Sequence, residues 1–112
     1  MKGTKTLREM CDALGVKRRA VQGYEKLGLV SASGKNKYGY LLYDDKSQER
    51  IRLIKDYQML GFKLKEIKEL IDAPQYVIKE ALQRQMVKLQ KDKENLSDVI
   101  NMAESWIESI KE

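Results

Sequence analysis

The chain has 112 residues, of which 35% are charged, 42% are hydrophobic and one is proline. This composition is typical of a helix-rich globular protein, and no apolar run reaches the roughly 20 residues that cross a bilayer. One cysteine and no histidine exclude an internal disulfide, the usual zinc ligands and the commonest general base. We therefore expect no metal, no cofactor, no membrane contact and no enzyme activity, and, without a signal-peptide core after Met1, a cytoplasmic protein.

The net charge of +5 is unevenly distributed along the chain. Residues 1–70 carry 16 basic against 9 acidic side chains, whereas residues 71–112 carry 6 against 8. A basic part followed by a mildly acidic part is typical of a protein that binds an anionic polymer at one end. A charged surface that serves only solubility is the alternative.

Two short helices separated by Gly15-Val16 are predicted near the N-terminus. Thr6 and Glu9 have the spacing of a capping box, and Gly15 ends the first helix in the usual way. The second helix runs from Val16 to Gly28. Apolar side chains recur at helical spacing in both segments, namely Leu7, Met10, Cys11, Leu14, Val21, Tyr24 and Leu27. These proportions indicate a helix-turn-helix, in which Cys11 belongs to the core rather than to a redox sensor.

Residues 31–43 are rich first in turn formers and then in aromatic residues, which predicts a short β-hairpin with a basic tip, a wing. Asp44 or Asp45 is expected to cap a third helix. The predicted buried face of that helix consists of Ile51, Ile54 and either Met59 or Leu60, with Tyr57 close by. After a turn at Gly61-Phe62, a fourth helix is predicted to bury Leu64, Ile67, Leu70 and Ile71 and to end before Pro74.

From Gln75 onward neither glycine nor proline interrupts the chain, and a heptad pattern indicates a long coiled-coil helix. We therefore expect two parts, a DNA-binding head in residues 1–73 and a dimerisation helix in residues 75–112. A stripe this long requires a partner, most simply a second copy. The predicted dimerisation residues are Ile78, Leu82, Met86, Leu89, Leu96, Val99, Ala103, Trp106 and Ile110. Gln85 and Asp92 interrupt the stripe, and they either weaken it or fix its register.

The basic residues at the start of the second helix are candidates for nucleic-acid contact, because the N-terminal end of a recognition helix approaches base edges. Arginine can donate two hydrogen bonds to guanine, and glutamine can bind adenine. Basic and tyrosine side chains of the hairpin could contact phosphates. The predicted DNA-binding residues are Lys17, Arg18, Arg19, Gln22, Tyr24, Lys35, Lys37, Tyr38 and Tyr40.

Four blocks of residues 4–72 resemble, in order and spacing, the head of the MerR family of transcription regulators. They are Gly15-Val16, Tyr24-Glu25-Lys26-Leu27-Gly28-Leu29-Val30, Gly39-Tyr40 with Tyr43, and Gly61-Phe62-Lys63-Leu64-Lys65-Glu66-Ile67. The resemblance implies a mainly α fold, with a winged helix-turn-helix head followed by a long coiled-coil helix. It also implies an antiparallel homodimer on a pseudo-palindromic promoter in double-stranded DNA, distortion of the promoter spacer, and RNA polymerase as a candidate partner.

Two departures from the family pattern concern the DNA contacts. The family commonly has threonine, arginine and an aromatic residue just before the position of Tyr24, where this chain has Ala20, Gln22 and Gly23. It commonly has arginine after the Gly-Tyr of the wing, where this chain has Leu41. Metal-sensing relatives carry cysteines near the end of the dimer helix and drug-sensing relatives carry a C-terminal ligand domain; we expect neither here, and the sequence assigns no effector. Two other functions remain as alternatives to a dimeric transcription regulator: an excisionase-like architectural factor and a coiled-coil protein-interaction module.

Overall fold

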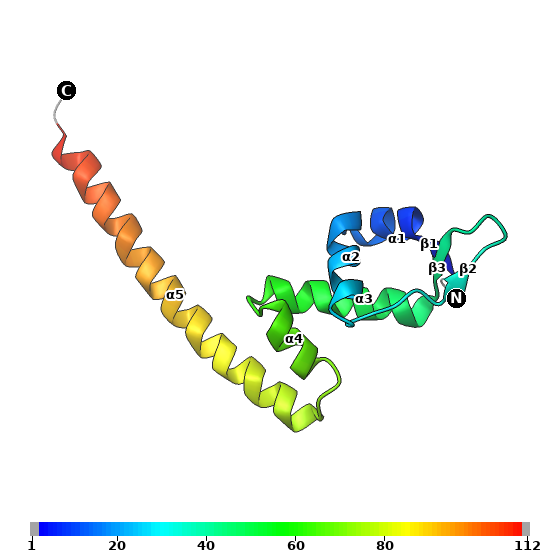
Figure 1. Ribbon diagram of the computed structural model, residues 1–112. Helices are drawn as coiled ribbons and strands as arrows, with labels where there is room; N and C mark the ends of the chain where they lie inside the picture. Colours follow the sequence, from blue (N-terminus) through cyan, green and yellow to red (C-terminus); the bar gives the residue numbers. More distant parts are fainter. Residues whose placement is uncertain (1–2, 111–112) are drawn as a thin grey trace. The chain divides into compact units, whose positions relative to one another are not determined.

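The computed structural model describes residues 3–110 and divides into two compact units, Met1–Ala73 and Pro74–Glu112. The first unit is the head, and the second is a single long helix (Figure 1). In chain order the elements are β1 (Lys5–Thr6), α1 (Leu7–Leu14), α2 (Arg18–Lys26), β2 (Gly34–Lys35), β3 (Leu41–Tyr43), α3 (Asp45–Met59), α4 (Leu64–Leu70) and α5 (Gln75–Ser109). The prediction of a winged helix-turn-helix followed by a long helix is confirmed.

Local signals define both ends of α1, as expected. The Thr6 hydroxyl accepts a hydrogen bond from the Glu9 amide at 3.3 Å, and the Glu9 carboxylate accepts one from the Thr6 amide at 2.9 Å. Gly15 follows the helix with φ +63°, a conformation in which a side chain would be strained. The predicted capping box and glycine stop are therefore confirmed.

The sheet has the order β1-β3-β2, and both pairs are antiparallel. Strands β2 and β3 form the predicted wing, whose loop extends away from the helices of the head (Figure 1). Strand β1 was not predicted, because two residues are too short to show the alternation of a strand. Thr6 of β1 lies opposite Leu42 of β3, so β1 joins the wing to the start of α1.

The core of the head takes side chains from its four helices, from β3 and from the segment after α2. Its fully buried large side chains are Met10, Val21, Leu29, Tyr43, Ile51, Ile54 and Ile67. The prediction that Met59 or Leu60 completes the buried face of α3 is wrong, since these side chains are 77% and 38% exposed. Phe62 instead packs edge-to-face on Tyr57, with the ring centroids 5.8 Å apart.

Arg50 of α3 connects two segments that follow other helices. Its Nε donates to the carbonyl of Leu29, and its two terminal nitrogens donate to the two carboxylate oxygens of Asp72 at 2.8 Å each. Such a bidentate pair fixes the orientation of the two side chains and places opposite charges in direct contact. The hydrogen bonds from Arg50 hold the pKa of Asp72 below its ordinary value. Arg50 therefore ties the chain after α2 and the chain after α4 to α3.

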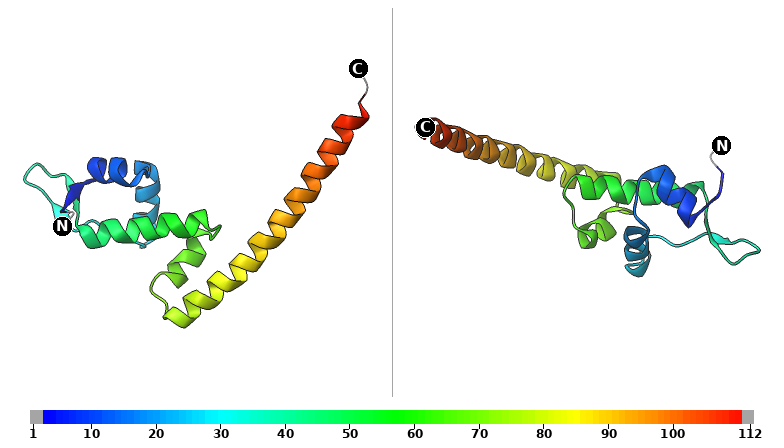
Figure 2. Two further views of the ribbon diagram at one scale, coloured as in Figure 1. Left: turned by 180° about the vertical axis from the view of Figure 1, so that it is seen from behind. Right: turned by 90° about the horizontal axis from the view of Figure 1, so that it is seen from above.

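Helix α5 is continuous over its 35 residues, about 52 Å at 1.5 Å per residue (Figure 2). Pro74 stands at its N-cap, where the missing amide proton costs nothing. The long C-terminal helix is thus confirmed up to Ser109. The last two residues of the predicted dimerisation helix, 111 and 112, lie outside the described residues.

Candidate nucleic-acid interface

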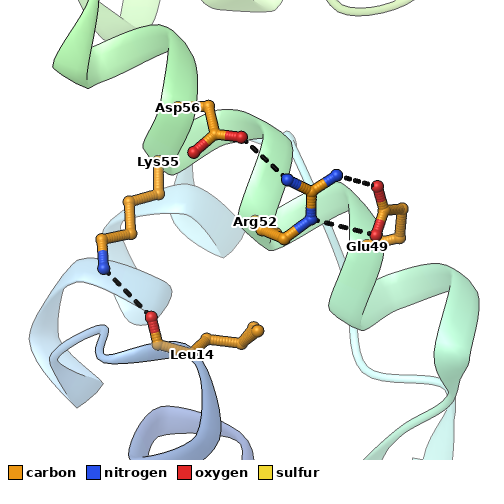
Figure 3. A network of polar contacts seen from close by, with 5 residues as sticks. All are labelled: Leu14, Glu49, Arg52, Lys55 and Asp56. Carbon is orange, nitrogen blue, oxygen red and sulfur yellow. Dashed lines mark hydrogen bonds and ion pairs between the residues drawn. The ribbon is translucent and has the colours of Figure 1, made fainter. Parts of the chain in front are cut away.

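The turn between α1 and α2 is held from a third helix. Lys55 of α3 donates from Nζ to the carbonyls of Leu14 and Gly15 at 3.0 and 2.9 Å, and Figure 3 shows the bond to Leu14. Helix α1 has no basic residue in its last turn, so Lys55 supplies the positive charge that the C-terminal end of a helix favours. Val16, in the turn itself, is buried. The turn that precedes α2 is therefore held by the hydrogen bonds from Lys55 and by the burial of Val16.

The face of α3 beside Lys55 is occupied by an ion-pair network. Arg52 lies between Glu49 and Asp56 on consecutive turns of the same helix (Figure 3). These pairs neutralise the arginine within α3. Arg52 is accordingly not a candidate for binding an anion.

The N-terminal end of α2 carries an unfavourable charge for a helix. Lys17 is the N-cap and makes no side-chain cap, Arg18 and Arg19 follow, and no acidic residue lies in the first turn. The positive end of the helix dipole favours acidic residues there, typically by about 0.3–1 kcal/mol. The side chains of all three are exposed and form no hydrogen bond or ion pair with another described residue. This end of α2 therefore lacks negative charge that an anionic ligand could supply.

Helical spacing extends this surface along α2. Arg18, Gln22 and Lys26 are four residues apart, so they form one row on the helix. All three are exposed, as is Arg19 beside them. Lys26 was not among the predicted site residues, although the four-residue spacing would have identified it.

The opposite face of α2 is buried, and it contains one residue that was expected to bind DNA. Tyr24 is only 2% exposed, and its hydroxyl donates to Gln58 Oε1 at 2.6 Å. Burial raises its pKa. Tyr24 therefore serves the core of the head, and a contact of Tyr24 with DNA stays a prediction from the sequence alone. The hydrogen bond to Gln58 joins residues 34 positions apart, so no local pattern indicates it.

Beside Tyr24, a second pair ties α2 to the wing. The buried hydroxyl of Tyr43 in β3 donates to Glu25 Oε1. Burial, together with this carboxylate, raises the pKa of Tyr43. The pair fixes α2 relative to β3, the central strand of the sheet.

The wing presents its predicted residues to solvent. Lys35 lies in β2 and is exposed, and Tyr38 and Tyr40 are 72% and 64% exposed. The Asn36 side chain accepts hydrogen bonds from the amides of Tyr38 and Tyr40 at 2.9 and 3.0 Å, which shapes the tip. Lys37 Nζ lies 5.1 Å from the centre of the Tyr38 ring. The hairpin therefore holds basic and aromatic side chains in an ordered loop.

A groove of about 860 Å³ separates the wing from the two N-terminal helices. Its walls include Leu7, Arg8 and Cys11 of α1, Arg18 of α2, and Tyr40 and Leu41 of the wing. Cys11 is half-buried, and burial raises the pKa of its thiol. A protonated thiol reacts poorly with oxidants, which does not favour a redox role.

The apolar stripe of α5 is exposed within the single chain. The side chains of Leu82, Leu89, Val99 and Trp106 are between 36% and 66% exposed. All the predicted dimerisation residues lie on this one helix or at its C-terminal end.

The charge of α5 changes sign along its length. Residues 75–93 have five basic and two acidic side chains, a balance of +3, whereas residues 94–110 have four acidic and no basic ones. Two copies that run in opposite directions therefore place opposite charges against each other. Copies that run in the same direction place like charges together.

In the described part of the chain, no three side chains gather as metal ligands. None of the described helices is long and apolar enough to cross a membrane. The residues predicted from the sequence to bind DNA include most of the exposed polar residues of α2 and of the wing. They do not include Lys26 of α2 or Arg8 of α1, which is exposed and lines the groove.

Two helices joined by a tight turn, a hairpin beside the second helix and a long C-terminal helix define a winged helix-turn-helix protein. The family model described as "MerR HTH family regulatory protein" matches residues 5–74. The chain belongs to the MerR family, which is a family of DNA-binding transcription regulators and not of enzymes.

Several proteins are similar over most of this chain. The HTH-type transcriptional activator mta of Bacillus subtilis (strain 168) is 32% identical over 104 residues, which are 93% of this chain and 40% of that protein. The crystal structure of MtaN, the N-terminus of this multidrug transporter activator, has a TM-score of 0.75 and 31% identity, and covers 92% of this chain and 97% of MtaN. HiNmlR, a MerR family regulator lacking the sensor domain, has a TM-score of 0.69 at 20% identity, over 93% of this chain and 87% of HiNmlR.

The chain spans less than half the length of the first curated relatives it matches, 40% and 48% of them.

Proposed function

We propose that the protein is a sequence-specific regulator of transcription that binds double-stranded DNA as a homodimer. The observation that carries the proposal is the basic start of α2. Lys17, Arg18 and Arg19 stand where a helix favours acidic residues, and their side chains form no hydrogen bond or ion pair with a described residue. Phosphates of a duplex would supply the missing negative charge.

The row on α2 also has the chemistry for reading bases. Arg18 or Arg19 can donate two hydrogen bonds to guanine, and Gln22, one turn on, can bind adenine in a bidentate manner. Lys35, Lys37, Tyr38 and Tyr40 of the wing suit contacts with the sugar-phosphate backbone. We infer that α2 supplies specificity and the wing supplies position.

We infer an antiparallel homodimer from the stripe and the charges of α5. A helix of this length cannot bury its stripe on itself, and the opposite charges of its two halves favour copies that run in opposite directions. The side chains that the second copy would cover are the half-buried Ile78 and the exposed Leu82, Met86, Leu89, Leu96, Val99, Ala103, Trp106 and Ile110.

Two heads at a fixed separation suit a pseudo-palindromic site in a promoter. Bending or untwisting the spacer between half-sites costs on the order of 1–6 kcal/mol, which contacts from the second head can offset. The similar proteins support this context: mta is an activator, HiNmlR is bound to promoter DNA, and EcmrR is described in a complex with DNA. RNA polymerase is a further partner that such a mechanism would require.

The DNA proposal is tested with the variant Arg18→Ala/Arg19→Ala in binding to duplex DNA at several salt concentrations. We expect weaker binding and a shallower dependence of log K on log salt, by about 0.9 for each phosphate that the variant no longer neutralises. Lys88→Ala/Lys91→Ala removes the same charge from α5 and should change neither the affinity nor the slope. If the two double variants behave alike, the assignment of α2 as the recognition helix is wrong.

The orientation of the dimer is tested by cross-linking the variant Cys11→Ser/Ile78→Cys. In a parallel pair the two introduced thiols would meet within the roughly 4.4–6.8 Å Cα distance that a disulfide needs. In an antiparallel pair centred on residue 92 they lie about 42 Å apart at 1.5 Å per residue. We expect no disulfide-linked dimer under oxidising conditions, and its formation would contradict the antiparallel arrangement.

A further inference from the structure

The groove between the wing and the first two helices contains two arginines whose side chains form no ion pair with another described residue. Arg8 of α1 and Arg18 of α2 both line it, and neither side chain has a hydrogen bond with a described residue. Asp12 is the one carboxylate in the lining. Glu9, next to Arg8 in sequence, is turned to the Thr6 amide instead. The groove therefore has a net positive charge.

The remaining walls suit the uncharged part of a nucleotide chain. Leu7 of α1 and Leu41 of the wing provide apolar surface, and the exposed Tyr40 provides an aromatic ring with a hydroxyl. A sugar can pack on such a surface while guanidinium groups bind the phosphates on either side of it. The volume of about 860 Å³ is far larger than the roughly 30 Å³ of a water molecule.

The wing itself contributes no positive charge to this groove. The residue after Gly39-Tyr40 is Leu41, and neither Lys35 nor Lys37 belongs to the groove lining. The cations come from the two helices on the other side. Arg8 is exposed, and it lies in the first turn of α1, whose cap is formed by other side chains. Its charge is therefore not required for the helix that carries it.

We propose that Arg8 binds a backbone phosphate of a DNA strand that runs through this groove, between α1 and the wing. This inference rests on the proposed function and adds α1 to the DNA-binding surface. Arg8 thereby supplies, from the opposite wall, the phosphate contact that Leu41 cannot make. Arg18 lines the same groove and also belongs to the row on α2, so it joins the backbone contact to the base-reading surface.

The first test compares Arg8→Ala with Arg8→Lys in binding to duplex DNA across a salt series. Alanine has the highest helix propensity, so α1 should persist, and circular dichroism checks this. We expect the slope of log K against log salt to become shallower by about 0.9 for each head. For one head, this makes the gain in affinity from 1 M to 0.1 M salt about eightfold smaller. Arg8→Lys should retain most of the slope. An unchanged slope in Arg8→Ala would overturn the proposal.

A compensating change separates a phosphate contact from a structural role. In the variant Arg8→Ala/Leu41→Arg, the positive charge returns to the groove from the wing side. We expect this variant to recover the slope and most of the affinity, whereas a defect in the packing of α1 would not be repaired by an arginine on the wing. Failure to recover would count against the groove as the path of the strand.

The second test uses Cys11, which lines the same groove and is the only cysteine of the chain. Because burial raises its pKa, alkylation by iodoacetamide is followed in alkaline buffer, with and without saturating duplex DNA at low salt. A strand in the groove should slow the reaction. If the wild type binds DNA while the alkylation rate is unchanged, the groove proposal fails and the proposed function stands; if the wild type binds no DNA, both fail.

Discussion

Gly23 lies in the interior of α2 without any visible need for glycine. Its φ is not in the left-handed region, and a Cβ at this position would meet no atom within 4 Å. Glycine in a helix interior costs about 1 kcal/mol relative to alanine. We therefore expect Gly23→Ala to raise the free energy of unfolding by about 1 kcal/mol, which for a head of this size is a shift in Tm of roughly 4–8 °C.

Gly28 offers a matched control for this substitution. A Cβ there also meets no atom within 4 Å, but φ is +75°, a conformation that costs a residue with a side chain about 1–2 kcal/mol. Gly28→Ala should therefore destabilise the protein, although the surrounding space is equally open. Both variants are compared with the wild type by thermal unfolding at one protein concentration, because association makes Tm concentration-dependent.

The sign of the two changes decides whether the reasoning holds. If Gly23→Ala lowers the Tm or leaves it unchanged, Gly23 has a role in the folded head that the open space around it does not reveal. A stabilised variant that binds DNA less well would indicate instead that α2 approaches the duplex closely at this residue.

Three further predictions concern the helix-turn-helix, the acid range and α5. Lys55→Met should lower the unfolding free energy in urea by about 1 kcal/mol, because two carbonyls of the α1–α2 turn are deprived of their charged donor; an unchanged midpoint would show that the turn does not depend on Lys55. Arg50 lowers the pKa of Asp72, so this pair stabilises the fold above the ordinary carboxyl pKa and the contribution disappears as pH falls through the lowered value; Asp72→Asn should reduce the loss of stability in that acid range, and an identical pH profile would contradict the role of the pair. Leu89→Asp should yield monomers in sedimentation, because it would bury an unpaired charge, whereas Gln90→Asp on the neighbouring exposed position should remain dimeric; dimers in both variants would argue against the stripe as the interface.

Features that depend on neighbouring residues were predictable from the sequence. The capping box of Thr6 and Glu9, the glycine stop at Gly15 and the uninterrupted α5 all follow from spacing within a few turns of helix. The order of the head elements followed in the same way. These signals do not require knowledge of what each element packs against.

Features that depend on distant partners were not predictable. The sequence is compatible with an exposed or a buried Tyr24. The structure shows that its hydroxyl donates a hydrogen bond to Gln58, 34 positions later. Met59 or Leu60 was expected in the core, whereas both are exposed and the ring that packs on Tyr57 belongs to Phe62, in the turn after α3. Strand β1 exists only because β3, almost 40 residues later, offers an edge. In each case the decisive contact lies outside any local window.

The candidate site was predictable in its composition but not in its shape. Charge and spacing identified Arg18, Arg19 and the wing lysines. The groove that brings Arg8 beside Arg18 depends on how β1 and β3 place the hairpin against α1, and no pattern in the sequence indicates that distance.

Thr6 has two roles at once, since it pairs with Leu42 as the last residue of β1 and caps α1 through its hydroxyl. No spacer residue therefore separates the hairpin from the first helix, and the two have no hinge about which to adjust independently. If the proposed function holds, a bound duplex would have to adapt its own curvature and groove width to this fixed arrangement of the hairpin and α1. Sequences that deform easily would then be preferred even at base pairs that no side chain touches.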